Sequence, residues 1–276
     1  MRKSLFLISL LLSSAACSQS EDAIVPPGAV AESRAGVTAS ASATAPDEPS
    51  GTNFEANSSK GEAKREFSYS WPAEVSAVPQ LVRRFEEERD RELAAQKAEW
   101  QESLDSSPED CVSCRNRGFE KEWKVVSDLP DWLSLSADLY VYTGGAHGNY
   151  GRTSFVWSRN GQLALEGIDL FNSAVELETA LGAKLCDTLN EARAERRGTE
   201  VDRDGEGYFN DCPGIDEASV FVGSSNGQTF DRIGIYYGPY VAGSYAEGAY
   251  ELDFPVTASV LDAVKPEYAE AFSVRR

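Results

Sequence analysis

The 276-residue chain has a single histidine, His147, among 26 basic and 45 acidic residues. One histidine excludes a zinc site built on several imidazoles, and any Ser/His or Cys/His catalytic arrangement has to use His147. The sequence also lacks the Gly-Lys-Ser/Thr and G-x-G-x-x-G motifs that hold phosphates at the start of a helix. We therefore expect no metal site, no cofactor and no nucleotide.

Long apolar runs are scarce as well. After the first dozen residues no segment approaches the ~20 apolar residues that a membrane-spanning helix needs. The run Leu5–Leu12 follows two basic residues and precedes small ones, which predicts a signal peptide over residues 1–16. Cys17 after two alanines resembles a lipidation site, with plain secretion as the alternative. Because Ser18 and not aspartate follows, we expect an outer-membrane lipoprotein of a Gram-negative bacterium, facing the periplasm.

Basic residues are in the minority, and the formal net charge is −19. This charge argues against nucleic acid as a partner and against direct docking on anionic lipid headgroups, so membrane contact is expected only through the lipid anchor. The charge allows a cationic partner. The alternative interpretation is that it only keeps an exported domain soluble.

Only four cysteines remain once Cys17 is assigned to the anchor. An even number in an oxidising compartment predicts disulfides. Of the three connectivities, we expect the local pairs Cys111–Cys114 and Cys186–Cys212. The Cys-Val-Ser-Cys segment could instead be a redox or metal motif. Its polar loop context and the absence of a second Cys-x-x-Cys favour a structural disulfide.

The chain divides into a lipidated cysteine with a disordered Ala/Ser/Pro/Glu-rich tether, residues 17–65, and a folded remainder. Alternation and turn signals predict strands over 67–72, 122–126, 133–142, 153–157, 163–165, 218–222, 232–236 and 250–255. Apolar spacing predicts helices over 78–100, 173–197 and 258–264. These elements predict an α+β fold with mostly antiparallel sheets, two long amphipathic helices and a short C-terminal helix.

Two motifs occur in a distinctive order. Tyr-Thr-Gly-Gly-Ala-His-Gly follows a strand at 142–148, and Gly-Pro-Tyr-Val-Ala-Gly-Ser-Tyr-Ala-Glu-Gly covers 238–248. Residues 143–276 therefore resemble the bacterial exported family called domain of unknown function 3298. Residues 66–142 look like its usual partner, domain of unknown function 4163, and we expect the two to pack as one unit.

The resemblance implies a binding role at the cell envelope. One relative is the lysozyme-sensing anti-sigma factor, whose extracytoplasmic part binds lysozyme, and in another these domains precede a deacetylase that modifies peptidoglycan. This chain departs from both: it has no sigma-binding region, and a deacetylase metal site needs more than one histidine.

His147 supports two interpretations. It is either part of a recognition loop or general base, with Tyr142 and Asn149 nearby, or a residue whose hydrogen bond to the backbone locks a glycine turn. The second interpretation is preferred, and we assign no catalytic residue. Arg193, Arg196 and Arg197 are expected on a solvated helix end, where they favour the helix dipole. The candidate binding residues are Tyr142, Gly144, Gly145, His147, Asn149, Tyr237, Tyr240 and Tyr245.

We therefore expect a non-enzymatic binding module for lysozyme or another cationic protein, or for cell-wall glycan such as peptidoglycan. An envelope hydrolase that uses His147 or a carboxylate pair is one alternative. An accessory subunit of an envelope assembly is the other.

Overall fold

The computed structural model describes residues 50–202 and 207–275, in which the chain builds two β-sheets with helices. The larger sheet has the strand order β1-β3-β4-β5-β6-β7, with β2 paired to β3. All of its pairs are antiparallel except β3 with β4. Its strands are β1 (Thr52–Glu55), β2 (Ser58–Lys60), β3 (Ala63–Trp71), β4 (Arg117–Asp128), β5 (Trp132–Tyr142), β6 (Asn149–Ser158) and β7 (Leu163–Leu165).

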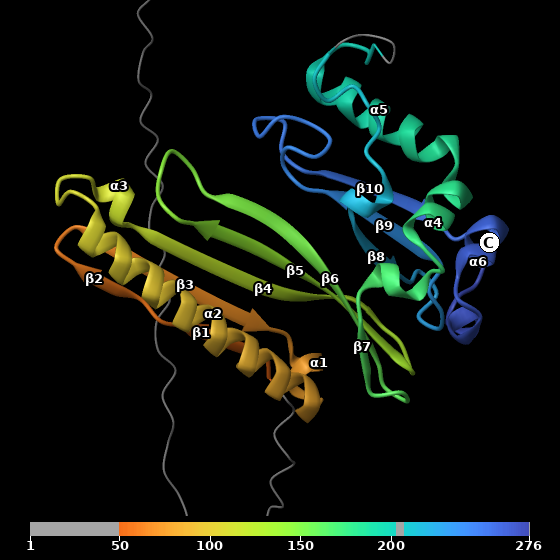
Figure 1. Cartoon of the computed structure of the whole chain (residues 1–276). Coiled ribbons are helices and arrows are strands. Elements are labelled where there is room, and N and C mark those ends of the chain that lie inside the picture. Colours follow the sequence, from red (N-terminus) through yellow and green to blue (C-terminus); the bar gives the residue numbers. More distant parts are fainter. Residues whose placement is uncertain (1–49, 203–206, 276) are drawn as a thin grey trace, which may run out of the picture. The chain divides into compact units, whose positions relative to one another are not determined.

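The parallel pair β3–β4 is joined by a helical crossover, as parallel strands require. After α1 (Ala73–Ser76), the 28-residue helix α2 (Pro79–Ser106) runs along one face of the sheet (Figure 1). Leu81, Phe85 and Leu93 of α2 are buried against aromatic residues of the strands, including Trp123. The short helix α3 (Val112–Arg115) then leads into β4.

The smaller sheet has the order β10-β9-β8 and is antiparallel throughout. Its strands are β8 (Ser219–Gly223), β9 (Arg232–Tyr237) and β10 (Tyr250–Pro255). It shares a second hydrophobic core with α4 (Ala174–Leu181), α5 (Ala183–Arg197) and α6 (Ala258–Ala263). Three short 3₁₀ segments complete the described chain: η1 (Gly167–Leu170), η2 (Ile215–Glu217) and η3 (Pro266–Ala271).

Strand β6 connects the two cores because neighbouring residues of a strand face opposite sides of the sheet. Phe155 and Trp157 pack in the core under α2, whereas Val156 between them packs in the core of the smaller sheet. At this end the larger sheet is covered on both faces. At the other end of β4, β5 and β6, the face away from α2 carries exposed residues, Glu120, Tyr140 and Tyr150.

The expected α+β fold is confirmed, with two corrections. Residues 52–60, assigned from the sequence to the tether, form β1 and β2, whose short polar strands become ordered by pairing with β3. The long helix expected over 173–197 is two helices, because Gly182 breaks it with φ +60°. The predicted signal peptide, Cys17 and the tether up to residue 49 lie outside the described residues.

The predicted division at residues 142 and 143 falls between two paired strands. β5 and β6 pair from Trp132↔Ser158 to Val141↔Asn149, so the larger sheet continues across it. The structure has the expected disulfide pairs, Cys111–Cys114 and Cys186–Cys212, with Cα–Cα distances of 5.3 and 5.6 Å. Within the described ranges, no helix is long and apolar enough to cross a membrane.

Candidate functional site

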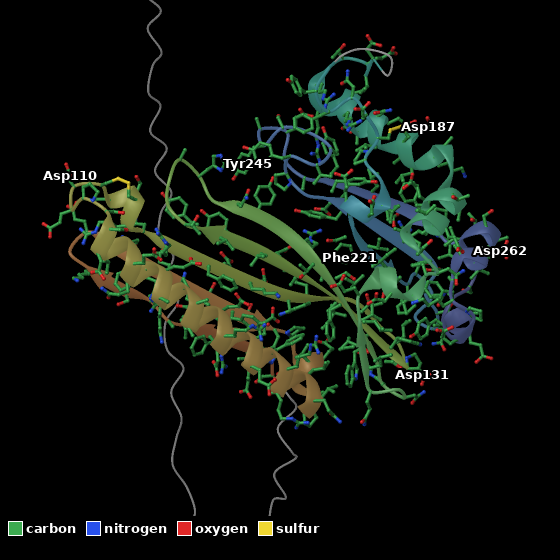
Figure 2. The ribbon with its side chains drawn as sticks, in the orientation of Figure 1. Asp110, Asp131, Asp187, Phe221, Tyr245 and Asp262 are labelled. Atoms are coloured by element: carbon green, nitrogen blue, oxygen red, sulfur yellow. A yellow bond between two sulfur atoms is a disulfide. The ribbon has the colours of Figure 1, made fainter. Side chains whose placement is uncertain are left out.

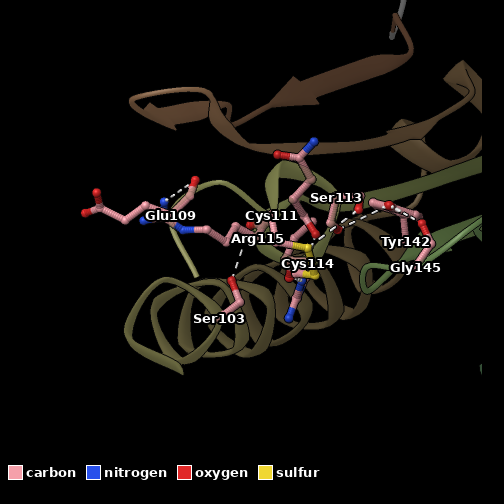
Figure 3. The surroundings of a disulfide bond; sticks show 10 residues. Ser103, Glu109, Cys111, Ser113, Cys114, Arg115, Tyr142 and Gly145 are labelled. Atoms are coloured by element: carbon pink, nitrogen blue, oxygen red, sulfur yellow. Dashed lines mark hydrogen bonds between the residues drawn. A yellow bond between two sulfur atoms is a disulfide. The ribbon is translucent and has the colours of Figure 1, made fainter. Parts of the chain in front are cut away.

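The loop that joins β5 to β6, residues 143–148, is held by its own backbone and by Tyr142, and is called the histidine loop below. Gly144 and Gly145 have φ +101° and +97°, values that favour glycine. The Tyr142 hydroxyl donates to the carbonyl oxygens of Gly145, at 2.8 Å, and Ser113, at 3.2 Å (Figure 3). This fixes the loop against the turn that contains α3.

The Cys111–Cys114 disulfide closes that turn (Figure 3). A Cβ atom on Gly144 would lie 3.2 Å from the Ser113 carbonyl oxygen, so the histidine loop packs directly on the turn. The Arg117 guanidinium donates to the Cys114 carbonyl at 3.0 Å. The Cys-x-x-Cys segment thus braces the histidine loop.

The loop that joins β9 to β10, residues 238–249, is held by arginines of α5 and is called the tyrosine loop below. Arg193 is fully buried and donates to the carbonyl oxygens of Ala242, at 2.9 Å, and Asp211, at 2.8 Å. Arg196 donates to the carbonyls of Glu247, at 2.8 Å, and Ala249, at 2.7 Å. The expectation of a solvated helix end is therefore wrong for Arg193, which is buried, whereas Arg196 is exposed as expected, although both side chains donate to carbonyl groups of distant segments.

Glu247 completes this support from inside the tyrosine loop. Its Oε2 accepts from Arg197 at 2.9 Å and from the Tyr250 hydroxyl at 2.6 Å, and its Oε1 accepts from the Ser244 amide at 3.2 Å. Burial raises the pKa of Glu247, but the hydrogen bonds from Tyr250 and Arg197 outweigh it and lower the pKa to about 2. The carboxylate is thus stabilised in its charged form.

The two loops meet at a group of aromatic residues. Tyr245, labelled in Figure 2, lies at their meeting point. The ring centroids of His147 and Tyr245 lie 4.0 Å apart, and the Tyr245 hydroxyl donates to the Gly148 carbonyl at 2.8 Å. The ring centroids of Tyr150 and Tyr240 lie 5.8 and 5.6 Å from the ring centroid of Tyr245. With Tyr140, which faces Tyr150 across the β5–β6 pair, these residues form what we call the tyrosine patch: Tyr140, His147, Tyr150, Tyr240 and Tyr245.

A cleft of about 350 Å³ opens beside the tyrosine patch, between the uncovered face of the larger sheet and the smaller sheet. Tyr140 and Tyr150 belong to its lining, so the two features are continuous. Four carboxylates and one guanidinium also line it: Glu120, Glu122, Asp138, Glu251 and Arg152. We call this the acidic cleft.

Arg152 sits at the centre of the acidic cleft and ties the two sheets together. It donates to Asp138 at 2.6 Å and to Glu251 of β10 at 2.7 Å. Burial raises the pKa of Asp138, but hydrogen bonds and ion pairs with Lys124 and Arg152 outweigh this effect and lower the pKa below its usual value. Among the described residues, Glu120 has no ion-pair partner, and it is exposed.

The structure brings together most of the predicted candidates. Tyr142, Gly144 and Gly145 shape the histidine loop, and Asn149 is exposed at its end. Tyr237 is the exception, because it is fully buried in the core of the smaller sheet and donates to the Pro213 carbonyl at 3.0 Å.

The sequence analysis missed Tyr140 and Tyr150. Their signal was present: in an alternating strand Tyr140 shares a face with Asp138, opposite the buried Ala137. The partners of Tyr140 on the next strand, in contrast, depend on the register between β5 and β6.

The histidine loop also has the backbone hydrogen bond that the preferred interpretation of His147 requires. Nδ1 of His147 lies 2.9 Å from the Gly148 carbonyl oxygen. That carbonyl can only accept, so Nδ1 is the donor of this hydrogen bond. Within residues 50–202 and 207–275, no three His, Cys, Asp or Glu side chains are placed to hold a metal ion.

Comparison with known proteins gives one family match. The family model described as "Deacetylase PdaC" matches residues 57–150, which run from β2 into β6. The matched residues include 66–142, the region expected from the sequence to form the partner domain, and the description of the model names a deacetylase. A search of curated proteins finds no match.

Two solved structures are similar to the chain. One is a DUF3298 family protein from Pseudomonas aeruginosa PAO1, at 18% identity and a TM-score of 0.46, covering 83% of this chain and 99% of that one. The other is a member of the same family from Bacteroides fragilis NCTC 9343, at 16% identity and a TM-score of 0.43. The match covers 74% of this chain and 89% of that one. Both are members of the family that the two loop motifs resemble.

Proposed function

We propose that this chain, whose residues 57–150 match the PdaC family model, is a binding module for a cationic protein at the cell envelope. The observation that carries the proposal is the continuity of the tyrosine patch with the acidic cleft. The patch offers contact area and the cleft offers negative charge on one surface.

The tyrosine patch has the composition of a protein-binding surface. Tyr140, Tyr150 and Tyr240 are 40%, 37% and 52% exposed, which is high for large side chains with apolar rings. Tyrosine is enriched at interfaces because a rigid ring buries apolar area at little entropic cost while its hydroxyl stays available for hydrogen bonds. Tyr140 and Tyr150 lie on paired strands of the larger sheet and Tyr240 lies on the braced tyrosine loop, so little ordering is needed on binding.

The acidic cleft favours a partner with exposed lysine or arginine. Its lining carries four carboxylates against one guanidinium, and the chain as a whole has a net charge of −19. A concave surface with an excess of negative charge speeds the encounter with a positively charged partner. Glu120 is the carboxylate best placed for this role, because it is exposed and lacks an internal ion pair in the described chain.

Calorimetric titration of the purified chain with lysozyme, a basic envelope-active protein, tests the proposal. We expect saturable 1:1 binding that persists at moderate salt and weakens about tenfold in Tyr240→Ala and in Glu120→Gln. Glu267→Gln is the control, because Glu267 is an exposed carboxylate of η3, outside the cleft lining. Absence of heat at low salt, or equal weakening by Glu267→Gln, would contradict a specific site.

A separate assay of acetate release distinguishes binding from catalysis. The PdaC model names a deacetylase, and an envelope hydrolase would use His147 or a carboxylate pair. In our proposal the chain releases no acetate from an N-acetylated glycan oligomer, and His147→Ala changes only the affinity for lysozyme. Acetate release that is lost in His147→Ala would contradict it.

Residues 1–17 support attachment of the module to the outer membrane through a lipidated Cys17, facing the periplasm. The binding surface would then be held near the membrane by the residues that precede β1. Mass spectrometry of the mature N-terminus tests this: a diacylglycerol adduct on Cys17 is expected, and an unmodified N-terminus would contradict it.

A further inference from the structure

A second cavity lies on the opposite face of the larger sheet from the acidic cleft. It has a volume of about 580 Å³, within the range of small-molecule sites, and shares no residue with the acidic cleft. Its walls are α2 on one side and β6, β7 and η1 on the other. Its floor is apolar, since Phe85, Trp123 and Phe155 pack there with ring centroids 4.6 to 5.7 Å apart. We call it the helix groove.

Cationic side chains of α2 and β4 line the helix groove. Arg84 and Arg91 are two turns apart and therefore share a face of α2. The Arg84 guanidinium lies 5.5 Å from the centroid of the Phe155 ring, and among the described residues it has neither a hydrogen bond nor an ion pair. Lys121 reaches the groove from β4, with its ammonium 4.6 Å from the centroid of Trp123.

Three of the four carboxylates that line the helix groove are engaged, and the fourth, Glu87, is exposed on α2. Glu88 accepts from Lys121 and, at 2.8 Å, from the buried Tyr69 hydroxyl. Glu166 and Asp169 cap η1 reciprocally, each accepting from the other's backbone amide. Among the described residues Arg84 is thus a cation over an aromatic ring with no hydrogen bond or ion pair to Glu87 or to any other carboxylate of the lining. That arrangement suits a carboxylate whose attached carbon chain lies on the apolar floor.

Strand β7 adds a main-chain surface to the same groove. It is the outermost strand of the larger sheet after β6, so one side of its backbone is not paired within the sheet. Ala164 and Leu165 of β7 line the groove. An extended peptide can pair with such an edge while its terminal carboxylate reaches a cation.

We propose that the helix groove binds a short extended peptide, with its terminal carboxylate on Arg84 and its backbone along β7. This site is separate from the tyrosine patch, so it stands or falls independently of the proposed function. It gives the chain a second ligand of a different chemical class.

The test is a titration of the ¹⁵N-labelled full chain followed by NMR, using acetyl-trialanine, its C-terminal amide and glucuronate as probes. We expect acetyl-trialanine to shift the amide signals of residues 153–155 and 163–166 saturably. Loss of the carboxylate in the amide probe should weaken binding about tenfold. Glucuronate, a carboxylate without a peptide backbone, should bind more weakly than acetyl-trialanine.

Arg84→Gln should weaken the binding of acetyl-trialanine about tenfold. Arg83→Gln is its matched control, because Arg83 is the exposed neighbour on α2 and is not part of the lining. No saturable shift, equal binding of the amide probe, or an equal effect of both substitutions would overturn the proposal. Glucuronate binding as tightly as the peptide would overturn the role of β7.

Discussion

The histidine loop and the tyrosine loop meet in one surface, but they are held by different means. The histidine loop is fixed locally, by two glycines with positive φ, by the Tyr142 hydroxyl and by the turn that Cys111–Cys114 closes. The tyrosine loop is fixed from a distance, by arginines of α5 some fifty residues earlier in the chain. The stability of the histidine loop should therefore depend on backbone geometry, and that of the tyrosine loop on charged side chains.

The largest effect is expected at the charge-dependent loop. Arg193→Met should destabilise the fold by about 3–4 kcal/mol, because it removes a buried guanidinium and leaves the buried carbonyl of Ala242 and the carbonyl of Asp211 without their donor. Chemical denaturation measures the change. Lys184→Met is the control on the same helix, since Lys184 is exposed, and it should change stability by less than about 0.5 kcal/mol. Equal effects of the two substitutions would show that Arg193 does not support the loop.

The acid sensitivity of the tyrosine loop follows from Glu247. Its pKa in the folded chain is about 2, below the usual 4.5, so its contribution to stability is complete above about pH 4.5 and is lost as the pH falls towards 2. Denaturation as a function of pH should show this loss, and Glu247→Gln should abolish that part of it. At neutral pH the substitution should cost about 2–3 kcal/mol. If Glu247→Gln loses stability with falling pH in the same way as the unaltered chain, Glu247 is not the source of the acid sensitivity.

A smaller effect is expected at the histidine loop. Gly144→Ala should cost about 1–2 kcal/mol, since alanine is strained at φ +101° and its Cβ would approach the Ser113 carbonyl at 3.2 Å. Gly227→Ala provides a control with φ +69° and open space around the added Cβ. Gly144→Ala should be the more destabilising of the two and, unlike Glu247→Gln, should not change the pH profile. A change in that profile would mean that the two loops are not held independently.

The two loops also differ in how far the sequence predicts them. The Gly-Gly pair after an alternating strand predicts the turn at residues 143–148, and the local cysteine spacing predicts the disulfide that supports it. Nothing local distinguishes Arg193 from a solvated residue at a helix end, because its partners are in segments that only the tertiary fold brings near. For the same reason Tyr237, in a glycine-rich and tyrosine-rich segment, looks like a surface residue but is buried.

The fold shows the same division between local and long-range signals. Apolar spacing predicts α2 and alternation predicts β5, both of which the structure has. The short polar strands β1 and β2 have no such pattern, since their order comes from pairing with β3. The break at Gly182 was hidden because the leucines of α4 and α5 keep their four-residue spacing across it.

The central claim is that the two loops form one binding surface, and hydrogen exchange measured with and without lysozyme tests it most directly. We predict that lysozyme slows amide exchange in residues 143–149 and 238–249 together, while residues 258–271 exchange at unchanged rates. Protection of one loop alone, or of neither, would contradict a shared surface built from His147, Tyr240 and Tyr245.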